Sequence, residues 1–202
     1  MLLNFNGPTD TYLFFFDTET TGLPRRWGAP LRDLDNWPRM VQLAWILCDE
    51  AGNEMASANR IILPQGYLIP REASRVHGIT TERALKEGIP LADALDEALP
   101  QLEKAASVVA HNISFDEKIF GAECLRLNRP FPFEKKAMRC TMKESTNYCG
   151  LPGRYGQCKY PNLTELHRKL FQKAFQDAHD ALADVRACKT AFFELRTRGI
   201  MA

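Results

Sequence analysis

The chain has 202 residues and a formal net charge of +1, with 45% hydrophobic and 25% charged residues, 12 glycines and 12 prolines. This composition excludes disordered, collagen-like and coiled-coil proteins, and it leaves the question of a polyanionic partner to the distribution of charge along the chain. The length favours one domain over residues 1–202, with a core large enough to fold without disulfides or metals.

The first half of the chain begins with strands and continues with helices. In order it predicts a strand at residues 11–16, a strand at 40–48, a turn at 49–54, a strand at 56–63, short helices at 70–88 and a helix at 91–105. The first strand is aromatic and lacks polar alternation, which is typical of a central strand buried on both faces. Gly78 interrupts the short helices, and Pro100 is expected to bend or split the helix at 91–105.

The second half alternates between strands and helices. In order it predicts a strand at residues 107–110, a helix at 114–127, a strand at 137–141, a loop or hairpin at 147–161, a helix at 162–171 and a final amphipathic helix at 178–198. Ser114 with Glu117 and Asn162 with Glu165 form capping-box patterns that begin two of these helices. The alternation favours an α/β fold with a central mixed sheet flanked by helices.

Positive charge is concentrated in one part of the second half. Residues 126–176 contain eleven lysines and arginines but only three acidic residues. Tyr148, Tyr155 and Tyr160 interrupt this basic stretch, as expected for a surface that contacts phosphates and stacks on bases. A solvated basic surface without a ligand is the alternative interpretation.

The cysteines and the N-terminus favour a cytoplasmic protein. Six cysteines without any C-x2-C pair predict free thiols rather than a disulfide framework. Intervals of nine residues separate Cys140, Cys149 and Cys158, but these intervals do not match the usual spacing of metal ligands. No run approaches about 18 consecutive apolar residues, and the first ten residues do not have the pattern of a secretory signal.

Asp17 and Glu19 follow the first strand and are two positions apart. If the strand continues, both carboxylates project from the same face of the sheet. Two carboxylates held so close raise each other's pKa unless a cation neutralises them, which makes a hard divalent metal the natural ligand. A helix cap or a solvated turn is the alternative for such an isolated D-x-E pattern.

Acidic side chains also follow the strand at residues 107–110 and open the final helix. Asp116 alone could be a first-turn acid favoured by the helix dipole, and His179 alone a surface or capping imidazole. Asp180 and Asp184 share a helix face, and their repulsion disfavours that placement without a cation. Because three separate segments each supply acids, the sequence predicts that they converge on a metal site.

Three segments resemble the exonuclease motifs of the DEDD superfamily. They are Asp17-Thr18-Glu19-Thr20-Thr21-Gly22-Leu23, His111-Asn112-Ile113-Ser114-Phe115-Asp116 and His179-Asp180-Ala181-Leu182-Ala183-Asp184. The histidine in the third is similar to that of the DEDDh branch, which includes the proofreading epsilon subunit of bacterial DNA polymerase III and several exoribonucleases. Val76-His77-Gly78-Ile79-Thr80 resembles the substrate-side segment of that branch. The resemblance covers residues 12–195 and implies a ribonuclease H-like fold with a central mixed five-stranded sheet, forming one exonuclease domain.

The resemblance also implies roles for individual residues. Asp17, Glu19, Asp116 and Asp184 would hold two Mg²⁺ or Mn²⁺ ions, with His179 as the general base, so all five are expected to be catalytic. His179 lies five positions before Asp184, or about 140° around a helix, and is therefore expected at the helix entrance. Asp180 has no implied ligand role. The implied substrate-binding residues are Thr20, Thr21, Gly22, Leu23, Glu72, His77, Asn112 and Phe115.

The implied activity is 3′-to-5′ hydrolysis of single-stranded DNA, releasing nucleoside 5′-monophosphates by a two-metal mechanism with a histidine base. The nearest alternative is an exoribonuclease of the same branch that acts on RNA 3′ ends or short oligoribonucleotides, because tolerance of a 2′-hydroxyl depends on geometry. A non-catalytic nucleic-acid-binding domain and a dinuclear phosphoesterase for small molecules are alternatives of other classes. A polymerase and a second copy of the chain are the protein partners that the resemblance suggests, and no membrane partner is expected.

Overall fold

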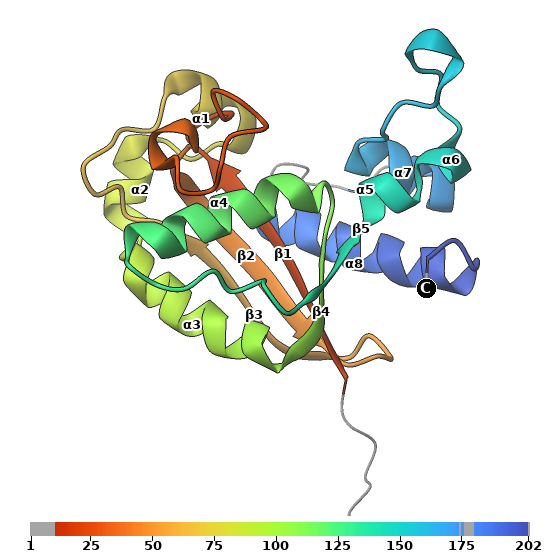
Figure 1. Cartoon of the computed structure of the whole chain (residues 1–202), viewed down its shortest axis with the longest axis horizontal. Helices are drawn as coiled ribbons and strands as arrows, with labels where there is room; N and C mark the ends of the chain where they lie inside the picture. Colours follow the sequence, from red (N-terminus) through yellow and green to blue (C-terminus); the bar gives the residue numbers. More distant parts are fainter. Residues whose placement is uncertain (1–10, 174, 176–179, 202) are drawn as a thin grey trace, which may run out of the picture.

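A five-stranded sheet forms the centre of the protein (Figure 1). The computed structural model describes residues 11–173, 175 and 180–201. The strands are β1 (Tyr12–Thr20), β2 (Met40–Cys48), β3 (Glu54–Ile61), β4 (Ala105–Ala110) and β5 (Ala137–Cys140). They lie in the order β3-β2-β1-β4-β5, where β2 is antiparallel to both of its neighbours and β4 is parallel to β1 and β5. The predicted mixed sheet is confirmed.

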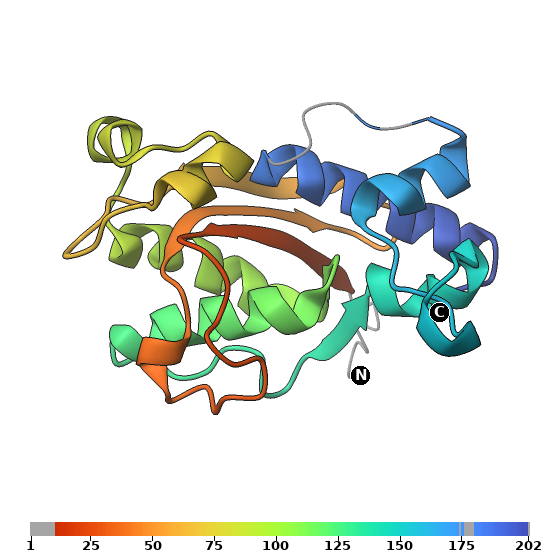
Figure 2. The same cartoon turned by 90° about the horizontal axis from the view of Figure 1, so that it is seen from above.

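Helices cover both faces of this sheet (Figure 2). The longer ones are α3 (Leu91–Lys104), α4 (Ile113–Arg126), α7 (Leu163–Phe171) and α8 (Ala181–Thr197). The shorter ones are α1 (Arg71–His77), α2 (Thr81–Glu87), α5 (Thr141–Glu144), α6 (Thr146–Cys149) and the 3₁₀ turns η1 (Leu34–Asn36) and η2 (Arg154–Gly156). Helices α3 and α4 pack on one face, and α7 and α8 on the other.

The alternation of side chains along β1 divides the core into these two layers. Phe14 and Phe16 are buried against α3 and α4, whereas Leu13 and Phe15 are buried against α8. Burial of each phenylalanine contributes roughly 1.5–3 kcal/mol to the hydrophobic stabilisation. The strand extends to Thr20, four residues beyond its predicted end, so its two carboxylates lie within the sheet rather than after it.

Two helix predictions need correction. Pro100 lies inside α3 without splitting it, because only four residues follow it and the buried Leu102 still packs on the sheet. The capping box predicted at Ser114 is wrong, since Asn112 is the N-cap in the left-handed region at φ 68° and Ser114 Oγ donates to Asn112 Oδ1 over 3.3 Å. The helix therefore begins at Ile113, within one residue of the expected start.

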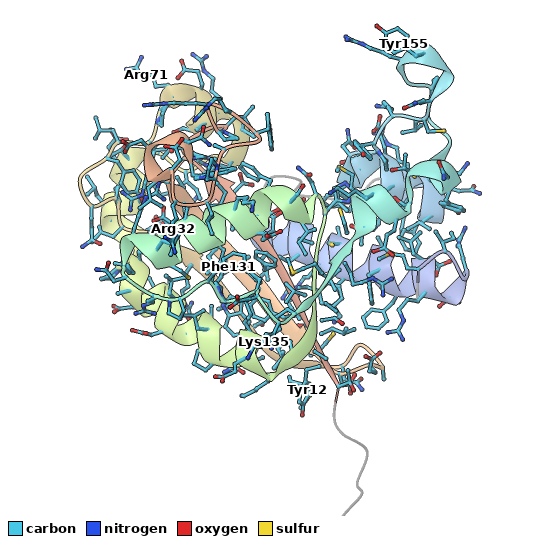
Figure 3. All side chains as sticks on the ribbon, in the orientation of Figure 1. Tyr12, Arg32, Arg71, Phe131, Lys135 and Tyr155 are labelled. Carbon is cyan, nitrogen blue, oxygen red and sulfur yellow. The ribbon has the colours of Figure 1, made fainter. Side chains whose placement is uncertain are left out.

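The other helix and loop predictions agree more closely with the structure. The capping box of Asn162 and Glu165 is confirmed, with both reciprocal hydrogen bonds present. The predicted loop at 147–161 overlaps α6 and contains η2. The part of this loop around η2 projects as an arm, with Tyr155 at its tip (Figure 3). The predicted start of the last helix at residue 178 lies outside the described residues, and described α8 begins at Ala181.

The cysteines and the helix lengths can be compared with two further expectations, that the thiols are free and that no segment spans a membrane. All six cysteines are free thiols, and only Cys158 is exposed. Among the described residues, the acidic cluster that could hold a metal contains no cysteine, so the alternative of a cysteine metal site gains no support. No helix in the described ranges combines the length and hydropathy that crossing a bilayer requires.

Candidate metal centre

Three carboxylates meet where β1 approaches the start of α8. Oxygen atoms of Asp17, Glu19 and Asp184 all lie within 4.8 Å of one another. The first two share the face of β1 that packs against α8, and Asp184 lies in the first turn of that helix. Asp180 begins the helix as its N-cap, because its side chain accepts a hydrogen bond from the Ala183 amide over 3.1 Å. The cap fixes the first turn and therefore the position of Asp184.

Asp116 completes the acidic group from the opposite layer of the fold. It lies in the first turn of α4 and is only 3% exposed. Its Oδ1 accepts hydrogen bonds from the Thr18 hydroxyl at 2.7 Å and the Thr18 amide at 3.0 Å. These two bonds join α4 to β1 between Asp17 and Glu19. The expected convergence of acids from separate segments is therefore present in the structure.

The carboxylates strongly perturb one another. Burial, followed by repulsion from Asp116, Asp184 and Glu19, raises the pKa of Asp17 well above its ordinary value. Burial, followed by repulsion from Asp184, Asp116 and Asp180, raises the pKa of Glu19 to about 8. For Asp116, burial raises the pKa to about 7 despite the opposing hydrogen bonds from Thr18. A cation would relieve both the repulsion and the cost of burying charge.

This set of donors fits a hard divalent cation. Carboxylate oxygens are the ligands that Mg²⁺ and Mn²⁺ prefer, and the cluster of Asp17, Glu19 and Asp184 contains no sulfur or nitrogen donor. Among the described residues, these three carboxylates thus form a cluster that could hold a divalent cation, and Asp116 lies close enough to repel them. His179, the predicted base, lies outside the described residues.

His111 lies near the acids, and the sequence analysis assigned it no separate role. Its Nε2 lies 3.0 Å from the Pro161 carbonyl oxygen, which can only accept, so Nε2 carries the proton. Its Nδ1 then accepts from the Thr141 hydroxyl at 3.0 Å. Burial lowers its pKa to about 4, so the ring is neutral near pH 7. With Asp17 and Asp184 it lines a cavity of about 230 Å³.

A second cavity, of about 390 Å³, has Glu19 in its lining. It is lined by Thr18, Glu19, Thr20, Gly22, Leu23, Glu72, Ala73, Val76, His77 and Phe115. We refer to it as the Glu19 cavity. Six of the eight residues predicted to bind substrate line it, and they come from the end of β1, from α1 and from α4. Its size is in the usual range for small-ligand sites.

Two predicted substrate residues do not line either cavity. Thr21 instead clamps β1 to the residue before β2, because its amide donates to the Arg39 carbonyl at 2.9 Å and its hydroxyl accepts from the Arg39 amide at 3.0 Å. Asn112 forms the left-handed turn at the start of α4. Both residues thus hold the backbone beside the site, and their contact with a substrate stays a prediction.

The backbone of Gly22 and the ring of His77 are both held in place by hydrogen bonds in the wall of the Glu19 cavity. Gly22 has a φ of 146°, a backbone conformation that residues other than glycine rarely adopt. The Thr20 hydroxyl donates a hydrogen bond to the Gly22 carbonyl oxygen over 2.7 Å. Nδ1 of His77 accepts from the Ile79 amide at 3.1 Å, so in the neutral ring the proton is on Nε2.

The basic stretch is less available to a ligand than its charge count suggests. Five of its cations make ion pairs or hydrogen bonds within the protein, namely Arg126, Arg129, Lys136, Arg139 and Lys159. Tyr148 is half-buried and contacts Lys169 and Arg198, while Tyr155 and Tyr160 are 98% and 60% exposed. Contact with phosphates therefore stays a prediction, and, within the described residues, only part of this stretch has cations without an intramolecular partner.

Comparisons with known proteins agree with this architecture. The model of the RNase_T family, described as exonuclease, matches residues 14–192. The chain is 30% identical over 183 residues to the uncharacterized exonuclease CP81 of Escherichia phage 186, covering 85% of this chain and 81% of that protein.

Solved structures of Exonuclease I share the fold. The E. coli enzyme in complex with a dT13 oligonucleotide has a TM-score of 0.72 and 21% identity, covering 93% of this chain and 41% of that one. The enzyme from Methylocaldum szegediense has a TM-score of 0.70 and 24% identity, again covering 93% and 41%. The chain thus spans about two fifths of the Exonuclease I chains, and its sheet and helices have their ribonuclease H-like arrangement.

Proposed function

This chain belongs to the RNase_T exonuclease family, and on that premise we propose that it removes nucleotides from the 3′ end of single-stranded DNA and releases nucleoside 5′-monophosphates. The observation that carries the proposal is the position of Glu19, which belongs to the carboxylate cluster and also lines the Glu19 cavity. A terminal nucleotide in that cavity would have its phosphodiester beside the acids. The oligonucleotide in the E. coli Exonuclease I structure supports single-stranded DNA as the substrate.

We propose that Asp17, Glu19, Asp116 and Asp184 hold two divalent cations. Such a pair activates the attacking water and stabilises the leaving 3′-oxygen of the phosphodiester. Two observations support this proposal. Thr18 fixes the orientation of the Asp116 carboxylate, and the pKa values of Glu19 and Asp116 are raised by burial and by repulsion that a positive charge would relieve.

The remaining residues would bind and orient the substrate. Phe115 and Leu23 offer apolar surface to the terminal base or sugar, and the backbone of Gly22 allows close approach. His77 would contact the terminal phosphate or sugar, while Glu72 would accept from the 3′-hydroxyl. His179, which precedes the N-cap of α8 in the sequence, would accept the proton of the attacking water.

Digestion of end-labelled single strands tests this function. DNA and RNA oligomers of the same sequence, labelled at either the 5′ or the 3′ end, are incubated with Mg²⁺, Mn²⁺ or EDTA. We expect a stepwise ladder from the 5′ label and immediate mononucleotide release from the 3′ label, both abolished by EDTA. Equal activity in EDTA, or release from the 5′ end first, would overturn the proposal, and preferred cleavage of RNA would assign the exoribonuclease alternative.

A further inference from the structure

An exposed tryptophan lies beside the Glu19 cavity. Trp27 belongs to the loop between β1 and β2 and is 58% exposed, whereas Trp37 and Trp45 are buried. Its ring centroid lies 5.8 Å from that of Phe115, with an angle of 51° between the planes. Phe115 lines the cavity and Trp27 does not. Trp27 therefore lies at the rim of the cavity, separated from it by the ring of Phe115.

The loop that carries Trp27 is held in place by buried groups. Asn36, only 4% exposed, accepts from the Arg26 amide at 2.8 Å and donates to the Arg26 carbonyl at 3.0 Å. On the other side of Trp27, the indole of Trp37 donates to the Pro30 carbonyl at 3.1 Å. Arg126 of α4 donates to two further carbonyls of this segment, which lies beside α4 (Figure 2). The indole is therefore presented by a preorganised backbone.

The surroundings of Trp27 are cationic. Arg25 and Arg26 precede it directly and Arg32 follows on the same loop, and all three are exposed. Arg26 pairs with Asp33 at 2.9 Å, yet its side chain stays 72% exposed. An exposed aromatic ring with neighbouring cations is the arrangement with which proteins bind single-stranded nucleic acid, since the ring stacks on a base and the cations attract phosphates.

We propose that Trp27 stacks on the base of the nucleotide that precedes the terminal one in a bound single strand. The inference rests on the proposed function, because it takes the Glu19 cavity as the site of the terminal nucleotide. Trp27 would then distinguish an oligonucleotide from a free mononucleotide, which reaches only the cavity. Fixing the loop before binding limits the loss of conformational entropy that ordering it would cost.

Steady-state kinetics of three variants test this role. For Trp27→Ala we expect KM for dT12 to rise about 10-fold, in line with the loss of one base–aromatic stack, while the inhibition constant of dTMP stays unchanged. Trp27→Phe keeps an aromatic ring and should stay within about 3-fold of the wild type. Leu85→Ala removes an equally exposed apolar side chain from α2 and serves as the matched control.

Intrinsic fluorescence gives an independent readout, because Trp27 is the exposed one of the three tryptophans. In an Asp17→Asn background without turnover, dT12 should quench the emission, and Trp27→Phe should abolish the quenching. If the wild type degrades dT12 and Trp27→Ala has an unchanged KM, the inference fails while the proposed function stands. A wild type that degrades neither DNA nor RNA would overturn the proposed function itself. Melting curves verify that each variant is folded.

Discussion

Asp17 and Glu19 lower the stability of the folded protein when no cation is bound, although the proposed activity depends on them. Each is held near Asp184 in a partly buried position, which raises its pKa in the absence of a cation. We expect Asp17→Asn to lower exonuclease turnover more than about 10²-fold, because a direct ligand should matter more than the outer-shell partners whose loss costs 10–100-fold. End-labelled single-stranded DNA with Mg²⁺ measures the loss.

Asp180→Asn is the matched control for that substitution. Asparagine caps helices as well as aspartate does, so α8 keeps its first turn while one negative charge is removed. We expect activity within about 3-fold of the wild type. A loss as large as that of Asp17→Asn would show that Asp180 is a metal ligand rather than a cap.

The same residues predict an unusual dependence of stability on pH. Glu19 has a pKa of about 8 when folded, against an ordinary value of 4.5, and Asp116 about 7 against 3.8. Because the folded values are higher, the stability that the protonated groups contribute is fully present below the ordinary values and is lost as pH rises through 7 and 8. In EDTA, we expect the melting temperature to fall between about pH 6 and about pH 9.

Melting curves in EDTA and in Mg²⁺ measure this effect. At the higher pH, Asp17→Asn should melt above the wild type in EDTA, by about 2–4 °C for each kcal/mol of repulsion removed in a chain of this length. Mg²⁺ should raise the melting temperature of the wild type far more than that of the variant. A variant less stable than the wild type in EDTA would contradict the assigned repulsion.

At the scale of elements, the end of β1 depends on a buried carboxylate of α4. Glu123 is fully buried and accepts from the Met40 amide and from Nε of Arg39, each at 2.9 Å. Arg39 is also the residue that Thr21 clamps, immediately after the register shift between Glu19 and Thr20. The carboxylate of Glu123 thus fixes the register at which β1 presents its acids.

We expect Glu123→Ala to lower the free energy of unfolding by about 3–5 kcal/mol, because it leaves buried donors and charge without a partner. Urea denaturation measures the change. Glu87→Ala is the control, since its ion pair with Arg83 is 2.9 Å long but about half exposed and should contribute at most about 0.5 kcal/mol. Similar losses for the two variants would show that burial does not decide the strength of these pairs.

The elements also show what could be predicted from the sequence. Patterning predicted β2 at its observed bounds, because a strand covered on both faces is a continuous apolar run. It also located the other four strands. The end of β1 was missed, since Asp17 and Glu19 look like turn residues although pairing with Ala44 and Gln42 keeps them in the sheet. Likewise, nothing in the residue type of His111 reveals that Pro161, fifty positions away, fixes its tautomer.

The charge pattern predicted the available cations less well than the apolar pattern predicted the strands. A count of lysines and arginines does not tell which of them bind backbone carbonyls, as Lys136 does with two, or pair with an acid distant in sequence, as Arg129 does with Asp96. Trp27 had no motif to mark it, and only its exposure beside Phe115 distinguishes it from the buried tryptophans.

For the molecule as a whole, the acidic group joins two layers that pack on opposite faces of one sheet. Asp116 comes from the layer of α4 and Asp184 from that of α8, with β1 between them. We therefore expect activity in Mg²⁺ and helical circular dichroism to be lost together as urea rises, with one midpoint. Loss of activity at clearly lower urea would show that one layer detaches before the sheet unfolds.

Five of the six thiols lie in the protein interior, and burial raises the pKa of Cys48 and Cys124 to about 12. Maleimides react with accessible thiolates, so alkylation of the native protein should be confined to Cys158. A dye or spin label can thus be attached beside η2 without altering the sequence. Such a reporter would record whether the arm moves when an oligonucleotide binds.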